Sequence, residues 1–443
     1  MLDKNCCEVR YIVVERKKTH ANAIFIMMLF SAIIIESVCA AVFWGKLDIL
    51  TYNFPWAQIS AHQWAGMYRP QFAGTYQVNY PPLMPTLLWP VGKLINHFGL
   101  SISAGSSLRL AISFLLIKGL GMLFQWLTAG FIYWKSKRPV WGLLLSGLIL
   151  LNPSMWFNAA FWGQLDSALI FFIVVSFYYL KQERYYLASI WFALGCLTKL
   201  QFIYLVPIFG LELLSHVKWQ KVLKLVGTII GINLVGWLPF MINMKTIFLP
   251  LKVFGGGTTQ YADIVENGFN FWAGALKARI WNKQLRTTDH LVGWLTYGHL
   301  NTLILVLIVL ALCVWYWLVA TKRVRAIGLE YVGAIYSGLI FFFTMLQHER
   351  YQLSMLAFII LLLLTSANKA TLTNRDLSWY AVLTLATFIN QAGFYLAVYL
   401  NMQPLRYVHL IRLGGIINTL IFLLMVGLFC FKEYRDGEKR RLA

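Results

Sequence analysis

Charged side chains are scarce in this sequence, and acidic ones are the scarcest. The 443 residues include 38 lysines and arginines but only 17 aspartates and glutamates, so 12% of the chain is charged, about half of the ~25% found in a typical soluble domain. Hydrophobic residues make up 59%, and a soluble core cannot bury that much apolar surface. The composition excludes a soluble enzyme, a disordered protein and a fibrous protein, and it predicts an integral membrane protein with many spans.

Sequence motifs of several common enzyme classes are absent as well. The chain has no Asp-x-Asp pair that could bind a metal with a nucleotide sugar, no Gly-x-Gly-x-x-Gly after a strand, no P-loop and no His-Glu-x-x-His. The six cysteines show neither a disulfide framework nor zinc-ligand spacing. Nucleotide hydrolysis, nicotinamide chemistry and zinc proteolysis therefore have no support. We expect no cofactor and no metal-ligating residues, because lone acidic residues do not make a metal site, while the sequence leaves metal dependence open.

The net charge of +21 comes from short basic connectors between apolar segments. These connectors are Lys4–Lys18, Lys135–Arg138, Lys218–Lys224, Lys322–Arg325 and Lys432–Arg441. Basic residues concentrate on the cytoplasmic side of membrane proteins, where they also meet anionic lipid. The pattern predicts a multi-pass protein of the cell membrane with both termini in the cytoplasm. Its partner is the lipid bilayer, and nucleic acid is not expected to bind.

The apolar segments predict an all-α polytopic membrane protein with about twelve spans. The first run, 24–44, would be ~31 Å long as a helix. Residues 45–108 hold six of the twelve prolines, which break helices and remove backbone donors, so this segment is predicted to be a large external loop with short surface helices such as Pro55–Trp64. The other spans are expected near 109–134, 140–157, 166–180, 222–242, 300–320, 327–346, 352–367, 377–399 and 410–431, with two short helices in 186–214.

This arrangement gives one transmembrane domain flanked by two tails. Residues 1–23 and 432–443 are predicted cytoplasmic basic tails, and 24–431 form the domain. A second external loop covers about 243–299.

Two motifs on the external side contain carboxylates that could act in chemistry. Asp48 lies just beyond the first span, where partial burial would suit a general base; a solvated loop aspartate is the alternative. Trp162-Gly163-Gln164-Leu165-Asp166 could bind a sugar by stacking and hydrogen bonds. The alternative there is an interfacial tryptophan followed by a capping aspartate.

Cations in or near apolar segments are a second kind of candidate. Lys199 lies within an apolar hairpin, where a lone cation marks function unless it extends to the cytoplasmic surface. His348 and Arg350 stand together at a helix end and suit a phosphate; a simple boundary charge cluster is the alternative. Glu36 and Lys118 fall within spans, and we expect them to neutralise each other.

Five motifs follow one another in an order that resembles a known family. After the early Asp48 come Tyr80-Pro81-Pro82-Leu83, Trp162-Gly163-Gln164-Leu165-Asp166, the hairpin with Lys199 and Gln201, Asn267-Gly268-Phe269-Asn270-Phe271-Trp272, and His348-Glu349-Arg350-Tyr351. Over roughly 20–430 the chain resembles the GT-C class of polytopic glycosyltransferases. The nearest branches are bacterial mannosyltransferase-like proteins related to the second glycosylphosphatidylinositol mannosyltransferase, and the dolichyl-phosphate-glucose-dependent glucosyltransferases. Asn79 replaces the aspartate that usually precedes the tyrosine in this family.

The resemblance implies a mannosyl- or other hexosyltransferase that acts with inversion on the external face. The donor would be a polyprenyl-phosphate-linked sugar, and the acceptor a glycan or glycolipid. Asp48 would be catalytic, and Lys199, His348 and Arg350 would bind the donor phosphate. The sugar or the acceptor would contact Asn79, Tyr80, Trp162, Gln164, Asp166 and Gln201. The alternatives are a lipid-linked sugar flippase or transporter, and a polysaccharide polymerase or ligase.

Overall fold

The computed structural model describes residues 2–43, 45, 48–69, 77–100, 107–260, 262–276, 285–399 and 404–441. The prediction of an all-α protein is confirmed for these residues. Their extended structure is a small antiparallel hairpin of β1 (His290–Val292) and β2 (Leu295–Thr296), with two isolated bridges elsewhere.

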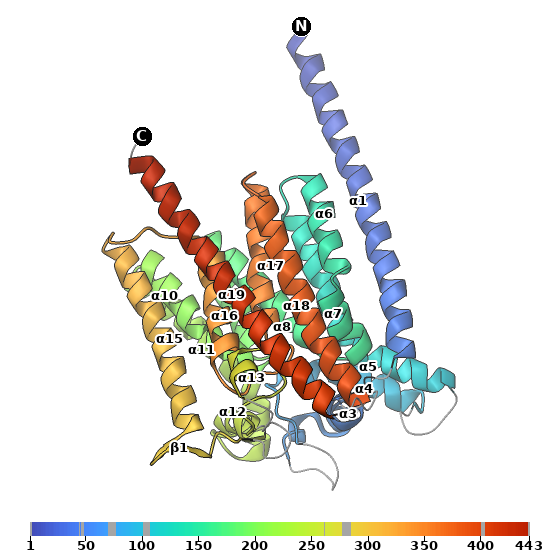
Figure 1. Ribbon diagram of the computed structural model, residues 1–443. Helices are drawn as coiled ribbons and strands as arrows, with labels where there is room; N and C mark the ends of the chain where they lie inside the picture. The colour runs from blue at the N-terminus through green and yellow to red at the C-terminus, as the bar shows by residue number, and fades with distance from the viewer. Residues whose placement is uncertain are drawn as a thin grey trace.

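The helices are named below as in Figure 1. In the N-terminal half they are α1 (Leu2–Val42), π-helical η1 (Ile49–Asn53), α3 (Phe54–Gln63), 3₁₀-helical η2 (Trp64–Gly66), α4 (Leu83–His97), α5 (Ser107–Lys135), α6 (Pro139–Leu150), α7 (Pro153–Trp156), π-helical η3 (Phe157–Trp162), α8 (Asp166–Lys181), α9 (Tyr185–Cys196) and 3₁₀-helical η4 (Leu200–Leu205). The rest are α10 (Val206–His216), α11 (Trp219–Met244), α12 (Leu249–Gln260), α13 (Phe271–Ala275), α15 (Tyr297–Ala320), α16 (Leu329–Phe343), α17 (Leu353–Asn368), α18 (Asn374–Tyr399) and α19 (Pro404–Arg441).

Five described helical segments are long and apolar enough to cross a membrane. They are Thr19–Val42, Ser107–Lys135, Trp219–Met244, Tyr297–Ala320 and Tyr407–Phe429, and the pair Pro139–Leu150 and Pro153–Trp162, bent by 42°, adds a sixth if it forms one span. Four further apolar helices have only 10–17 residues, and a 16-residue helix is ~24 Å long against a hydrocarbon core of ~30 Å. The chain thus has several membrane-capable helices, while the number twelve and the side on which each loop lies stay predictions.

Figure 1 places both termini at one end of the helix bundle and β1, α3 and α12 at the other. The described helices of the two segments predicted to form external loops, such as α3 and α12, therefore lie at the same end. The predicted surface helix Pro55–Trp64 is present as α3, and the predicted pair of short helices in 186–214 is α9 and η4–α10. The break between those two helices falls at Thr198 and Lys199. Lys199 lines one cavity with Leu251 of α12, and α12 lies at the end of the bundle opposite the termini.

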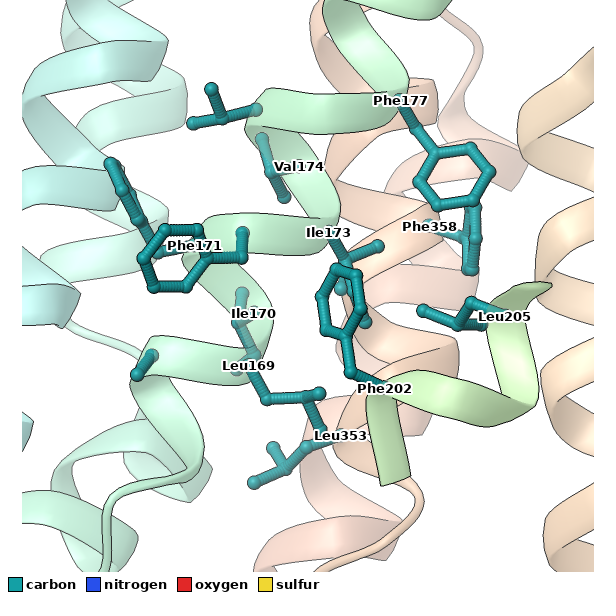
Figure 2. Close-up of a cluster of buried hydrophobic side chains, with 14 of the residues drawn as sticks. Leu169, Ile170, Phe171, Ile173, Val174, Phe177, Phe202, Leu205, Leu353 and Phe358 are labelled. Atoms are coloured by element: carbon teal, nitrogen blue, oxygen red, sulfur yellow. The ribbon is translucent and has the colours of Figure 1, made fainter. Parts of the chain in front are cut away.

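The core is centred on α8 and α17, whose side chains are buried almost all round. A helix that is apolar on every face belongs inside a bundle, and this pattern explains why both are enclosed by other helices. Figure 2 shows Phe177 of α8 facing Phe358 of α17. Toward the other end of the same two helices, Leu169 and Leu353 lie near Phe202 of η4. This packing fixes the start of α8, the start of α17 and η4 relative to one another, and the charged residues discussed below lie at those three places.

The expected pairing of Glu36 with Lys118 is wrong. Trp126 Nε1 donates a hydrogen bond to Glu36 Oε2 at 2.8 Å, whereas Lys118 Nζ donates to the carbonyl oxygens of Phe43, Ala160 and Phe161. The irregular end of η3 leaves backbone carbonyls without helical donors, and buried carbonyls require a partner. Lys118 supplies it and so ties the end of α1 to the end of η3.

Candidate active site

Asp48 is held against the turn that follows η3. It precedes η1, and its Oδ2 accepts a hydrogen bond from Trp162 Nε1 at 2.5 Å. Asn53, at the end of η1, donates from Nδ2 to the Gly163 carbonyl at 2.7 Å. Gly163 has φ +85°, a left-handed conformation that glycine adopts without a steric penalty. Two hydrogen bonds therefore fix the segment of Asp48 on the turn of Trp162 and Gly163.

A close approach of two backbones reinforces this placement. A Cβ added at Gly45 would lie 2.0 Å from the Trp162 carbonyl oxygen, so only glycine lets the end of α1 lie this close to η3. Lys118 links the same two segments through Phe43 and Phe161. The position of Asp48 is thus set by the packing of α1, α5 and η3.

Asp166 forms the centre of a buried ion cluster at the first residue of α8. Lys199 Nζ donates to Asp166 Oδ1, Arg350 Nε lies 3.4 Å from Oδ2, and Asn158 Nδ2 donates to Oδ2 at 3.1 Å. Asp166 is 0% exposed and Lys199 2% exposed. A carboxylate at a helix N-terminus is favoured by the helix dipole, and buried charges are tolerated when they are paired.

Arg350 links this cluster to the His348–Glu349 pair. Arg350 Nη1 donates to Glu349 Oε1 at 2.5 Å, and His348 Nδ1 lies 3.8 Å from Glu349 Oε2. Burial lowers the pKa of His348, so its imidazole is neutral near pH 7. Burial alone would raise the pKa of Glu349, but Arg350 and His348 outweigh it and hold that pKa below its usual value. The Glu349 carboxylate is therefore ionised beside the Arg350 guanidinium.

These groups surround one cavity of about 460 Å³. Eight of the ten residues that the sequence suggested line it: Asp48, Asn79, Tyr80, Gln164, Lys199, Gln201, His348 and Arg350. Trp162 and Asp166 do not line it; Trp162 is 1% exposed, and each lies directly behind a lining residue to which it is bonded. The cavity thus joins residues from the first predicted external loop, the α9–η4 break and the α16–α17 connection.

The lining of the cavity is of mixed polarity. Besides the charged residues above it includes Ile203 and Tyr204 of η4 and Pro250, Leu251 and Phe254 of α12, here named the apolar side. Ile203 is 42% exposed and Leu251 68% exposed. The apolar side therefore continues onto the outer surface of the bundle.

Sequence reasoning found Tyr80 but assigned no role to several other aromatic residues of the cavity. Tyr52 and Trp56 pack edge-to-face with ring centroids 5.5 Å apart, and Trp56 meets Tyr80 at 5.1 Å. Tyr204 and Tyr351 also line the cavity. The signals were present, because Tyr52 and Trp56 fall one turn apart just after Asp48, and Tyr351 follows Arg350. Aromatic rings are equally common at membrane interfaces, so the pattern alone indicated no site.

The Asn267–Trp272 motif fastens the segment of His348 from outside the cavity. Gly268 N donates to the Gln347 carbonyl at 2.9 Å, while Asn390 Nδ2 donates to the Asn267 carbonyl at 2.8 Å. Tyr407 Oη donates to Asn267 Oδ1 at 2.9 Å. Asn267 has φ +68°, a conformation that asparagine adopts more readily than most residues. The motif connects the α16–α17 turn to α18 and α19.

The burial of Glu266, beside this motif, leads us to expect that the stability of the fold depends on pH. Its carboxylate accepts a hydrogen bond from Asp263 N at 3.2 Å, and burial, followed by the nearby Asp263, raises its pKa from 4.5 to about 7. The folded chain holds the proton of Glu266 more tightly than the unfolded chain does. The contribution of this protonated carboxyl group to stability is therefore complete below pH 4.5 and is lost as the pH rises through 7. Glu266→Gln should unfold near the wild-type temperature at pH 5 and above it at pH 8, measured by thermal unfolding in detergent. The exposed Glu183→Gln is the control, and an unchanged pH dependence in Glu266→Gln would contradict the assignment.

Metal ligation has no geometric basis within the described ranges, where no three His, Cys, Asp or Glu side chains stand close enough to share an ion. That no residue of the site ligates a metal stays a prediction.

Residues 79–342 match the model of Glycosyltransferase family 87. The match covers more than half of the chain and includes Asn79, Trp162, Asp166 and Lys199, but it begins after Asp48 and ends before His348. None of the curated proteins matches the chain. On the extent of the family match, this membrane chain belongs to glycosyltransferase family 87.

Proposed function

We propose that this chain transfers a hexose, mannose being the first candidate, from a polyprenyl-phosphate-linked donor to a glycan or glycolipid acceptor, with inversion and on the external face. The observation that carries the proposal is the cavity itself, in which Asp48 and the cations Lys199 and Arg350 share one space with an apolar side. A base, a phosphate site and a path for a lipid are the three elements that such a reaction needs.

The donor phosphate is assigned to the charged side of the cavity. Lys199 has three N–H donors and Arg350 has five, and Asp166 and Glu349 use only some of them. The remaining donors can bind a phosphate, with the neutral imidazole of His348 as a further polar partner. Because both cations are already paired with carboxylates, the site is suited to a phosphodiester that carries a single negative charge.

The reaction needs one base in this scheme. Asp48 accepts the proton of the acceptor hydroxyl while the oxygen of that hydroxyl attacks the anomeric carbon. The bond from that carbon to the phosphate oxygen breaks, its electron pair stays on the phosphate, and Lys199 and Arg350 stabilise the added charge. Phosphate leaves without being protonated, so the paired carboxylates of glycoside hydrolases are not required. Attack from the face opposite the phosphate gives inversion.

The remaining candidates are assigned to sugar binding and to positioning. Asn79, Gln164 and Gln201 present amides to the cavity, and the rings of Tyr80 and Trp56 offer faces for stacking. Trp162 and Asp166 are assigned a positioning role instead of sugar contact, because both are buried behind the lining residues. The polyprenyl chain is assigned to the apolar side, along Ile203, Leu251 and Phe254.

The donor class provides the test of this proposal. Purified enzyme should transfer sugar from a polyprenyl monophosphate donor and not from a nucleotide sugar. Arg350→Ala should weaken donor binding by about 1.5–3 kcal/mol, the value of a hydrogen bond to a charged group, and should leave acceptor affinity nearly unchanged. Donor and acceptor KM are measured separately, and thermal unfolding shows whether the variant is folded.

Two controls accompany the Arg350 variant. Arg350→Lys keeps the charge but not the planar group of donors, so its donor affinity should lie between those of the wild type and Arg350→Ala. Arg286→Ala, at the same end of the bundle with a largely exposed side chain, should leave both KM values unchanged. Efficient turnover with a nucleotide sugar alone in lipid-free detergent would refute the proposal, as would an Arg350→Ala variant that lost acceptor affinity and kept donor affinity.

A further inference from the structure

A second large hollow lies between α15, α16 and α19, toward the end of the bundle that carries the termini. It has a volume of about 530 Å³ and apolar walls, among them Ile308, Leu312, Leu339 and Phe429. Only 11% of the most apolar stretch of α15 is buried, so α15 packs loosely against the bundle and the hollow forms a groove beside it. A groove of this kind on a membrane-capable helix faces acyl chains.

Basic side chains stand at the mouth of this groove. Arg325, from the α15–α16 connector, and Arg375, from the first turn of α18, both line it. Arg375 Nη2 lies 3.6 Å from Asp376 Oδ1 and donates to Tyr331 Oη at 3.5 Å. Its Nε is buried and has no hydrogen-bond partner among the described residues. Arg325 is exposed.

The charges around the mouth leave an excess of positive charge. Asp376 offsets Arg375, while Glu330, next to Tyr331, is bonded to Lys181 and to Thr365. Arg325 and the exposed Lys322 and Arg323 of the same connector add three positive charges. The mouth therefore combines an unused guanidinium donor with a local field that attracts anions.

We propose that this groove binds one anionic phospholipid, with an acyl chain between α15, α16 and α19 and its phosphate between Arg325 and Arg375. The apolar walls suit the chain, and the two guanidinium groups suit a headgroup phosphate. The site is separate from the cavity of Asp48, which lies toward the opposite end of the bundle, and it does not depend on the proposed reaction.

The test uses purified full-length protein in detergent with phosphatidylglycerol or phosphatidylcholine of identical chains. Native mass spectrometry should show one retained phosphatidylglycerol. Thermal unfolding should show a higher midpoint with that lipid, and phosphatidylcholine should produce neither effect. Arg325→Ala should reduce phosphatidylglycerol affinity at least about fivefold, since each cation near an anionic headgroup contributes roughly 1 kcal/mol. Ala311→Trp, at an exposed position lining the groove, should abolish retention by filling the space for the chain without a change of charge.

Arg323→Ala is the matched control, because Arg323 belongs to the same connector, stacks on Trp317 and does not line the groove. It should retain the lipid as wild type does. Equal losses of phosphatidylglycerol affinity in Arg323→Ala and Arg325→Ala would show only a diffuse basic surface. Retention of the lipid by Ala311→Trp would exclude the groove as its site. Either result overturns the proposal. So would displacement of the lipid by polyprenyl phosphate together with a changed donor KM in Arg325→Ala, because the groove would then belong to the donor.

Discussion

Replacement of Asp48 with asparagine should lower turnover by about 10²–10⁴-fold, the usual contribution of a positioned general base. Asparagine has nearly the same shape and can still accept the hydrogen bond from Trp162 through its amide oxygen, so the segment on η3 should keep its place. It cannot accept the proton of an acceptor hydroxyl. We therefore expect kcat to fall while the donor KM and the thermal unfolding midpoint stay close to wild type.

Two variants separate a role in catalysis from a general effect of charge. Asp289→Asn removes a carboxylate that accepts a hydrogen bond from Arg286 N, outside the cavity, and should leave turnover unchanged. Trp162→Phe keeps a ring but removes the N–H that orients Asp48, and it should lower kcat less than Asp48→Asn does. Near wild-type turnover of Asp48→Asn would remove Asp48 from the mechanism.

Replacement of Asp166 with alanine should cost about 3–5 kcal/mol of stability, as the loss of one partner of a buried ion pair does. Asp166 is bonded to Lys199, lies 3.4 Å from Arg350 and is fully buried. Without it Lys199, which is 2% exposed, loses the carboxylate to which it is bonded in the interior. We expect a lower yield of folded protein and a lower thermal unfolding midpoint.

The second replacement Lys199→Met tests this explanation. If unpaired charge is the cause, Asp166→Ala with Lys199→Met should recover a large part of the lost stability, because a buried pair can be replaced by apolar groups at little cost. Glu330→Ala is the matched control, because Glu330 is a buried carboxylate bonded to Lys181 and lies at the end of α16 away from the cavity. It should also destabilise the fold but leave the donor KM of the folded fraction unchanged. A double variant less stable than Asp166→Ala alone would contradict the account.

Hydropathy and proline content were sufficient to place most helices, because burial in lipid or in a bundle requires long apolar runs. The predicted segments 166–180 and 352–367 correspond closely to α8 and α17, and the break near Lys199 falls where the two short helices meet. The ten candidate site residues came mainly from the order of motifs, and the structure brings all ten to one cavity or directly behind it. Their individual roles stay predictions.

The sequence did not reveal which side chains and backbone groups form hydrogen bonds between distant segments. The partners of Lys118 are backbone carbonyls, which no side-chain pattern records, and two of them, those of Ala160 and Phe161, belong to the π-helical turn η3. The Asn267–Trp272 motif belonged to the resemblance without an assigned role, and its role depends on partners far away in the chain: Phe269 N donates to Asn390 Oδ1, and Asn270 Nδ2 donates to the Phe341 carbonyl. Hydropathy also treats a helix that touches lipid and a helix enclosed by protein alike, so the number of spans could not be fixed from it.

The arrangement of the ion cluster has a consequence for biosynthesis. A chain that enters the membrane from its N-terminus presents Asp166 and Lys199 with the α8–α9 pair, well before α17 has been made. Arg350 arrives later with an anion of its own, Glu349, as the adjacent residue. Within this cluster each stage of insertion thus adds one cation and one anion together, and an unpaired charge in the membrane is costly. The first half of the cluster is therefore already an ion pair before the second half is made, and the cavity is complete only when the last third of the chain arrives.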